Sequence, residues 1–399
     1  MKKKGALMSA VFNIKLSVEE EFMVKVLTHR DYLDCERVRL LHQSIGDKKL
    51  FELCEHNKIS SIAADALAQC YGQKKIASYW LNAYKNVDVR ISQYMLELEK
   101  VASLFASYDI PLVALKNSGI TKALYPHYGA CPMGDIDVLV KKTNFRQAHN
   151  ILIKQGYNLE FRSILEEENL DKAEQSGGAE YTVKLPNGDK LWFELQWRPV
   201  AGRWIRPDQE PSADELIEQS VKSEGSNVRI LSPEDNLLQV ALHTAKHTFV
   251  RAPGFRLHTD VDRIVRTTNI NWDLFVSKVC ALQVKTASFL SLAFAHDLLG
   301  TPIPLDVLDR IRPIAWKQHL MVKWLKYVGL FDPDKKKWGK LGYIIFVALL
   351  YDDIKGLFKG IFPPVTSIND YYSNKNKLWI PFLYLRRIIK LIFKRTLVK

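Results

Sequence analysis

Hydrophobic residues recur three and four positions apart through most of the chain, and strand-like runs are confined to its centre. From about residue 17 to residue 108 the spacing predicts packed helices without a repeat period. Runs of strand length follow at 111–115 and 135–140, separated by a turn at 116–119 and by a stretch with helical spacing. The pattern therefore predicts strand, tight turn, helix and strand in the middle of the chain.

A β-hairpin is predicted next. Residues 180–185 and 190–197 are strand-like, and an Asn187-Gly188 pair between such runs is a strong hairpin signal. Before it, residues 166–180 are rich in acids and contain Ser-Gly-Gly, so we expect an acidic, mobile loop there.

Three acids on the predicted strands form a candidate metal site. Asp135 and Asp137 share one strand face, opposite aliphatic residues, and Glu194 is an acid in a strand otherwise built for burial. Carboxylates this close repel each other unless a cation lies between them, and Mg²⁺ is typically held by such carboxylates together with substrate phosphates. The alternatives are a solvated strand edge for the aspartates and an ion pair with Arg198 or Arg203 for Glu194.

The turn after the first strand has residues suited to a triphosphate. Backbone N–H groups at a helix start, with a lysine ammonium and a hydroxyl nearby, can cradle phosphates. The candidate nucleotide-binding residues are Lys116, Asn117, Ser118 and Gly119.

At these motifs the sequence resembles the nucleotidyltransferase superfamily of DNA polymerase β, and within it a bacterial group of uncharacterised nucleotidyltransferases. The matching segments are Leu115-Lys116-Asn117, Leu124-Tyr125-Pro126, 131–140 and Glu194-Leu195-Gln196-Trp197, with further likeness through about residue 310. The sequence departs from the group at three places: Asn117 replaces a turn glycine, Cys131 an arginine and Gln196 a histidine. Since asparagine tolerates left-handed backbone, we expect Asn117 to preserve the turn.

The resemblance implies an α+β fold, with a small mixed-sheet nucleotidyltransferase core flanked by N-terminal and C-terminal helical regions. It implies that Asp135, Asp137 and Glu194 hold Mg²⁺ or Mn²⁺ and that an NTP is the co-substrate. We expect an N-terminal helical region at 1–108, the core at 109–205, a helical domain closing the site at 206–330, and an apolar segment with a basic tail at 331–399.

Two histidines lie four residues apart in a helix predicted to begin at Ser232-Pro233. His243 and His247 share one helical face, which is a spacing seen in zinc sites. No glutamate follows His243 as the metalloprotease motif requires, so contacts with a base or acceptor are favoured over zinc.

Composition gives the remaining expectations. The five cysteines are odd in number and lack paired spacing, which indicates neither a disulfide framework nor a zinc knuckle and favours a cytoplasmic protein. Of the net charge of +13, the last residues from Tyr371 contribute eight Lys or Arg and no acid. Helical spacing there predicts a basic amphipathic helix, which would lie on an anionic inner-membrane surface, bind nucleic acid, or pack on the domain.

The sequence suggests three candidate functions, each of a different functional class. The first is a metal-dependent nucleotidyltransferase that moves NMP from an NTP to a hydroxyl or amine acceptor, such as a surface-glycan or lipid-linked precursor, or a protein. The second is a degenerate binding module that senses nucleotide or a partner, favoured by Asn117 and Cys131. The third is a nucleic-acid-modifying enzyme, against which the confinement of basic charge to one tail argues.

Overall fold

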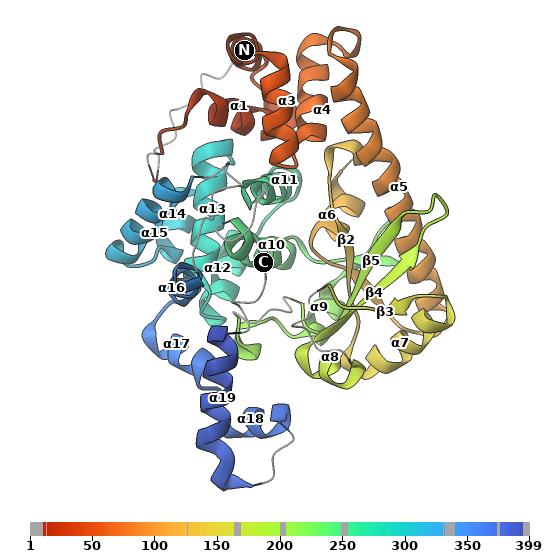
Figure 1. The fold of residues 1–399 in the computed structure, drawn as a ribbon, viewed down its shortest axis with the longest axis vertical. Coiled ribbons are helices and arrows are strands. Elements are labelled where there is room, and N and C mark those ends of the chain that lie inside the picture. Colours follow the sequence, from red (N-terminus) through yellow and green to blue (C-terminus); the bar gives the residue numbers. More distant parts are fainter. Residues whose placement is uncertain are drawn as a thin grey trace.

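The computed structural model describes residues 11–12, 14–125, 127–162, 169–199, 205–248, 254–329, 331, 340–372 and 376–393. Helices at the two ends of the chain flank one twisted sheet, and the last helices extend away from the body (Figure 1). This is the α+β architecture expected from the sequence.

The N-terminal region is helical, as predicted. Its helices are α1 (Val18–Leu27), α2 (Cys35–Ile45), α3 (Asp47–His56), α4 (Ser60–Tyr71) and the long α5 (Ser78–Ala106). Cys35 and Cys70 form a disulfide between α2 and α4, so the expectation of unpaired cysteines was wrong. The two cysteines are far apart in sequence and meet only because α2 and α4 pack together.

The strands form one mixed sheet of seven in the described residues, ordered β3-β4-β5-β2-β1-β7-β6. They are β1 (Leu112–Ala114), β2 (Asp135–Leu139), β3 (Asn158–Leu159), β4 (Gly178–Lys184), β5 (Lys190–Gln196), β6 (Val221–Lys222) and β7 (Val228–Ile230). β2 lies parallel to β5 and β1 lies parallel to β7. Because β6 and β7 join the same sheet, the sheet extends past residue 205, where we expected the core to end.

The predicted hairpin is confirmed, since β4 and β5 pair antiparallel around a turn in which Gly188 has φ +88°. The expected mobile loop before it is in part regular structure: α8 (Leu170–Ser176) is followed at once by β4, with Gly177 left-handed between them. The residues 163–168 lie outside the described part of the chain.

One face of the sheet is apolar and the other carries the acids. α5 and α7 (Phe145–Lys154) cover the apolar face, where Ile136 and Val138 lie in a buried cluster with side chains of both helices. The opposite face contacts α6 (Lys116–Leu124) and α9 (Ala213–Gln219), and Leu139 packs there against Leu216. The alternation of acidic and aliphatic residues predicted for 135–140 is therefore confirmed in β2.

The C-terminal helices are α10 (Pro233–Thr248), α11 (His258–Thr267), α12 (Trp272–Ala281), α13 (Lys285–Leu299), α14 (Leu305–Ile311), α15 (Ala315–Val328), α16 (Lys340–Leu350), α17 (Ile354–Ile361), α18 (Val365–Tyr372) and α19 (Ile380–Phe393). Those from α10 to α16 pack with the N-terminal helices into a second large core. Among the residues described, no helix is both long and apolar enough to cross a membrane.

Candidate active site

Pairing of three strands sets carboxylates in a row across the sheet. Asp137 on β2 is in register with Glu194 on β5, and Glu194 is in register with Glu180 on β4. Asp135 lies two residues before Asp137 and so shares its face. The structure thus brings the three predicted acids together and adds Glu180, which the sequence placed at the boundary between the acidic loop and the first strand of the hairpin.

Lys116 supplies a largely buried positive charge to this row. Its Nζ lies 2.6 Å from Asp137 Oδ1 and 3.6 Å from Glu194 Oε2. Its backbone has φ +50°, an uncommon conformation for a residue with a side chain, and its N–H donates to Gln239 Oε1 of α10. We expected Asn117 to take the left-handed conformation, but the turn uses Lys116 instead, which directs the ammonium toward the acids.

The other three turn residues fasten α6 to its neighbours. The buried Ser118 hydroxyl accepts a hydrogen bond of 3.0 Å from the Asp137 backbone N–H. A Cβ on Gly119 would lie 2.6 Å from the Ala114 carbonyl oxygen, so glycine allows α6 to approach β1. Asn117 Nδ2 donates to Asp260 Oδ2 of α11 over 3.0 Å.

Arg162, just after β3, is a second cation at the site that the sequence reading missed. Its Nη1 lies 2.6 Å from Asp135 Oδ2 and its Nη2 lies 3.4 Å from Glu194 Oε1. The Arg162 backbone N–H donates to Glu180, and the guanidinium lies over the Trp192 ring. Nothing in the local pattern marks Arg162, because it reaches the acids only through the pairing of β3 with β4.

Gln196 bridges two of the acids. Its Nε2 donates to Asp137 Oδ1 at 2.9 Å and to Glu194 Oε2 at 2.7 Å. Gln196 stands where the resembled group has a histidine, so this departure leaves a hydrogen-bond donor between the carboxylates.

The buried charges shift one another's pKa. Burial raises the pKa of Asp137 well above its usual value; the Lys116 ammonium lowers it, and the neighbouring Glu194 and Asp135 carboxylates raise it further. Burial opposes ionisation of Glu194 as well, but Lys116 and a hydrogen bond with Asp137 hold its pKa well below the usual range. Burial would lower the pKa of Lys116, yet Asp137 and Glu194 raise it, so the ammonium stays charged.

The second departure, Cys131, is a buried thiol. Its Sγ lies 2.7 Å from Thr121 Oγ1, and burial raises its pKa to about 12. Beside it, Arg256 from the C-terminal half donates from Nη1 to the Pro132 carbonyl oxygen. An arginine is thus present next to the position where the resembled group has one, although it comes from another part of the chain.

The paired histidines lie on α10 with ring centroids 4.4 Å apart. In the described part of the chain, no group of three or more His, Cys, Asp or Glu side chains has the arrangement of a metal site. The hypothesis that His243 and His247 bind zinc therefore has no third ligand among those residues.

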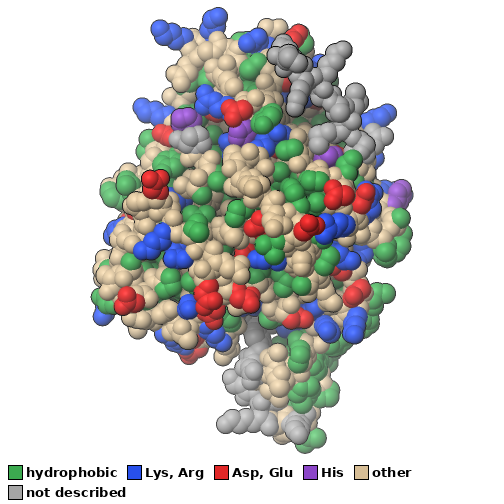
Figure 2. All heavy atoms as spheres, turned by 180° about the vertical axis from the view of Figure 1, so that it is seen from behind, with side chains coloured by type: hydrophobic (Ala, Val, Ile, Leu, Met, Phe, Trp, Pro, Cys, Tyr) green, Lys and Arg blue, Asp and Glu red, His purple; other side chains and the backbone are tan. Residues whose placement is uncertain are grey.

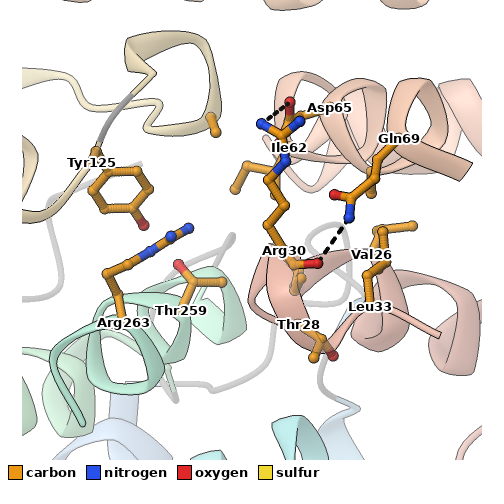
Figure 3. Close-up of a pocket in the computed structure, with 13 residues that line it drawn as sticks. Val26, Thr28, Arg30, Leu33, Ile62, Asp65, Gln69, Tyr125, Thr259 and Arg263 are labelled. Atoms are coloured by element: carbon orange, nitrogen blue, oxygen red, sulfur yellow. Dashed lines mark hydrogen bonds and ion pairs between the residues drawn. The ribbon is translucent and has the colours of Figure 1, made fainter. Parts of the chain in front are cut away.

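Two hollows lie beside Tyr125. One has a volume of about 30 Å³ and lies between α1, α4 and α11, where Arg30 faces Asp65 and Arg263 stacks on Tyr125 (Figure 3). It has room for little more than a water molecule. The second, of about 420 Å³, shares Arg30, Tyr125 and Arg263 with the first. Neither hollow is lined by Asp135, Asp137 or Glu194.

As they lie in this structure the three acids do not form a metal-binding group, but their donor chemistry fits a divalent cation. Asp135, Asp137 and Glu194 offer hard carboxylate oxygens on neighbouring strands, the ligand type that Mg²⁺ and Mn²⁺ prefer. In this structure those oxygens form ion pairs, Asp137 with Lys116 and Asp135 with Arg162. A metal bound there would share the carboxylates with these two cations or displace them.

A mixed sheet with acids on adjacent parallel strands, next to a strand–turn–helix that carries a buried lysine, is the arrangement expected of a nucleotidyltransferase. The family model described as "Uncharacterised nucleotidyltransferase" matches residues 43–300, and the chain belongs to that family. Membership supports nucleotidyl transfer as the general role and an NTP as substrate. No curated protein and no solved structure matches the chain.

Proposed function

We propose that this protein is a metal-dependent nucleotidyltransferase that moves NMP from an NTP to a hydroxyl or amine acceptor. The observation that carries the proposal is the register of β2 with β5, which sets Asp137 directly beside Glu194 with Asp135 on the same face. Three carboxylates in this position are the set that would hold Mg²⁺ or Mn²⁺. The metal, when bound, would stabilise the charge of the reacting phosphate.

The chain's own residues then bind and orient the nucleotide. The acceptor oxygen or nitrogen attacks the α-phosphorus, the bond to the β-phosphate oxygen breaks, and pyrophosphate leaves. The proton of the acceptor passes to one of the site carboxylates. Lys116 and Arg162 already neutralise those carboxylates, and both can turn to the triphosphate, whose negative charge is larger.

The turn residues would have two kinds of role, contact with the nucleotide and support of the site. Lys116 would contact phosphate through its side chain, and the backbone of the turn would approach the nucleotide. The buried Ser118 hydroxyl already accepts the Asp137 N–H, so we assign it to holding β2 rather than to phosphate. Asn117, which reaches Asp260, would tie the turn to the helices above it.

The experiment that tests this function incubates the purified protein with each labelled NTP, Mg²⁺ and a lysate separated into protein, lipid and small-molecule fractions. Label in the lipid fraction supports a lipid-linked acceptor, and label on protein supports modification of a polypeptide. Label in a surface-glycan precursor would appear in the small-molecule or lipid fraction. Nucleotide binding without transfer to any fraction would contradict the enzyme and favour the binding module.

A further inference from the structure

The last three helices expose an apolar surface that the proposed chemistry does not use. The exposed large apolar side chains along α17 and at its C-cap are Ile354, Phe358 and Phe362, with exposed fractions of 72%, 57% and 45%. Phe358 and Phe362 stack with ring centroids 6.2 Å apart. Side chains this large, exposed at a spacing of four on one helix, form a continuous stripe.

The next exposed stripe runs along α19 and the turn before it. Its members are Leu378, Trp379, Phe382, Leu385 and Ile389, each between 46% and 86% exposed. Their spacing of three and four places them on one helical face. Figure 2 shows hydrophobic side chains gathered on this lower protrusion of the molecule.

The other side of α19 packs against α18 and is hydrogen-bonded to the C-terminal end of α17 and the residues after it. Leu383 is buried, and the Tyr384 hydroxyl donates to the Pro363 carbonyl oxygen. Arg387 Nη2 donates to the Gly360 carbonyl oxygen at 3.3 Å. The arrangement that we had considered from the sequence, in which the apolar side packs on the domain, is therefore not the one the structure shows.

α17 is in turn held to the body of the protein. Arg206, itself 7% exposed, donates from Nη1 to the Gly356 carbonyl oxygen at 2.8 Å, and its guanidinium lies over the Tyr351 ring. The Asp353 side chain caps the helix by accepting from the Gly356 N–H. The apolar surface is thus presented from a fixed base.

Basic side chains accompany the exposed apolar ones. Lys355 and Lys359 lie four apart and exposed on α17, and Arg386 is exposed on α19. From residue 354 to residue 399 the sequence has ten Lys or Arg and one acid, Asp370. Apolar and aromatic side chains with flanking positive charge match the headgroup region of an anionic bilayer, where acyl chains take the apolar groups and phosphates take the cations.

We propose that α17 and α19 form a membrane-docking surface that seats this protein on an anionic lipid bilayer without crossing it. The surface consists of Ile354, Phe358, Phe362, Leu378, Trp379, Phe382, Leu385 and Ile389, with Lys355, Lys359 and Arg386 beside them. Charge complementarity selects lipid phosphate as the partner, and burial of the aromatic side chains supplies the apolar contribution. The proposal is independent of nucleotidyl transfer.

The test is sedimentation of the full-length protein with vesicles of phosphatidylcholine alone and of phosphatidylcholine with phosphatidylglycerol. The wild type binds the anionic vesicles, and added salt weakens that binding. Phe358→Ser with Phe382→Ser binds about tenfold more weakly or worse, since each ring loses its burial in lipid. Lys355→Gln with Lys359→Gln loses about tenfold at low salt.

The matched control is Leu96→Ser on α5, which removes an apolar side chain that is 64% exposed and lies away from this surface. It binds vesicles like the wild type. Unchanged vesicle binding by the Phe358→Ser, Phe382→Ser protein overturns the proposal, and so does a wild type that binds neither vesicle. A wild-type dimer in light scattering that the same variant dissociates, or salt-sensitive duplex DNA binding in place of vesicle binding, assigns the surface to another partner and also overturns it.

Discussion

Asp137 on β2 and Glu194 on β5 lie in register on parallel strands, and the Lys116 ammonium contacts both carboxylates. Two neighbouring carboxylates in a largely buried site could not both stay ionised without a cation. The pair therefore defines a place where positive charge is required, whether it comes from lysine, arginine or a metal.

Replacing Glu194 separates a catalytic role from an ion-pair role. Glu194→Gln keeps the shape of the side chain and removes one negative charge, so we expect turnover to fall at least about a hundredfold, as for loss of a metal ligand. The melting temperature should fall as well, because the variant loses the ion pairs of the mostly buried Glu194 with Lys116 and Arg162. The control is Glu160→Gln, which removes a surface ion pair with Lys190 and keeps an oxygen that can accept from the Thr182 hydroxyl. A lower melting temperature with normal turnover would assign Glu194 to its contacts with Lys116 and Arg162 instead.

Lys116→Met should weaken nucleotide binding. It removes a charged donor from the site, and hydrogen bonds to charged groups contribute about 1.5–3 kcal/mol, so Kd for NTP should rise about tenfold or more. Lys122→Met is the matched control, because Lys122 lies on the same helix and pairs with Glu99. Equal nucleotide affinities for the two variants would remove Lys116 from the binding site.

Gly119→Ala should destabilise the protein. The new methyl group would meet the Ala114 carbonyl oxygen at 2.6 Å, and backbone cannot yield cheaply, so we expect a loss of about 1–3 kcal/mol and a lower melting temperature. Gly134→Ala, whose methyl group meets nothing within 4 Å, is the control. A Gly119→Ala protein as stable as this control would show that α6 does not pack on β1 as closely as described.

Asp260 should make stability depend on pH. Burial raises the pKa of Asp260 from 3.8 to about 6, against the opposing effect of Arg256 and its hydrogen bonds. The folded state then binds this proton more tightly than the unfolded chain does. The contribution of Asp260 to stability is therefore largest below about pH 4 and falls as the pH rises to about 6, by about 3 kcal/mol in all.

Asp260→Asn should abolish that dependence. Relative to the wild type, the variant gains stability between pH 4 and pH 6 by about the same amount, and thermal unfolding at several pH values measures the difference. A constant difference in melting temperature across this range would show that Asp260 titrates in the folded protein as it does in the unfolded chain.

Much of the fold could be predicted because local patterns determine it. The alternation at 135–140 gave the faces of β2, and the Asn187-Gly188 turn gave the hairpin. Continuing the register of that turn along both strands would have paired Glu180 with Glu194, so this acid could have been found from the sequence. The first predicted helix likewise begins near residue 17, where Ser17 and Glu20 form a capping box.

The remainder of the site depends on contacts between distant segments. Arg162 reaches the acids from the end of a two-residue strand, and such a short strand leaves no periodic signal. Lys116 takes the left-handed conformation in place of Asn117 because Gln239, from α10, accepts its backbone N–H. The Cys35–Cys70 disulfide likewise needs the packing of α2 on α4.

The most direct test of the account is whether Mg²⁺ promotes NTP binding through Asp137. Calorimetric titration with each NTP, with and without Mg²⁺ or Mn²⁺, measures this before any acceptor is known. We expect the metal to strengthen NTP binding to the wild type, and Asp137→Asn to remove that gain while its circular dichroism stays that of the wild type. Metal-promoted binding that is equal in wild type and Asp137→Asn would contradict the assignment of this site.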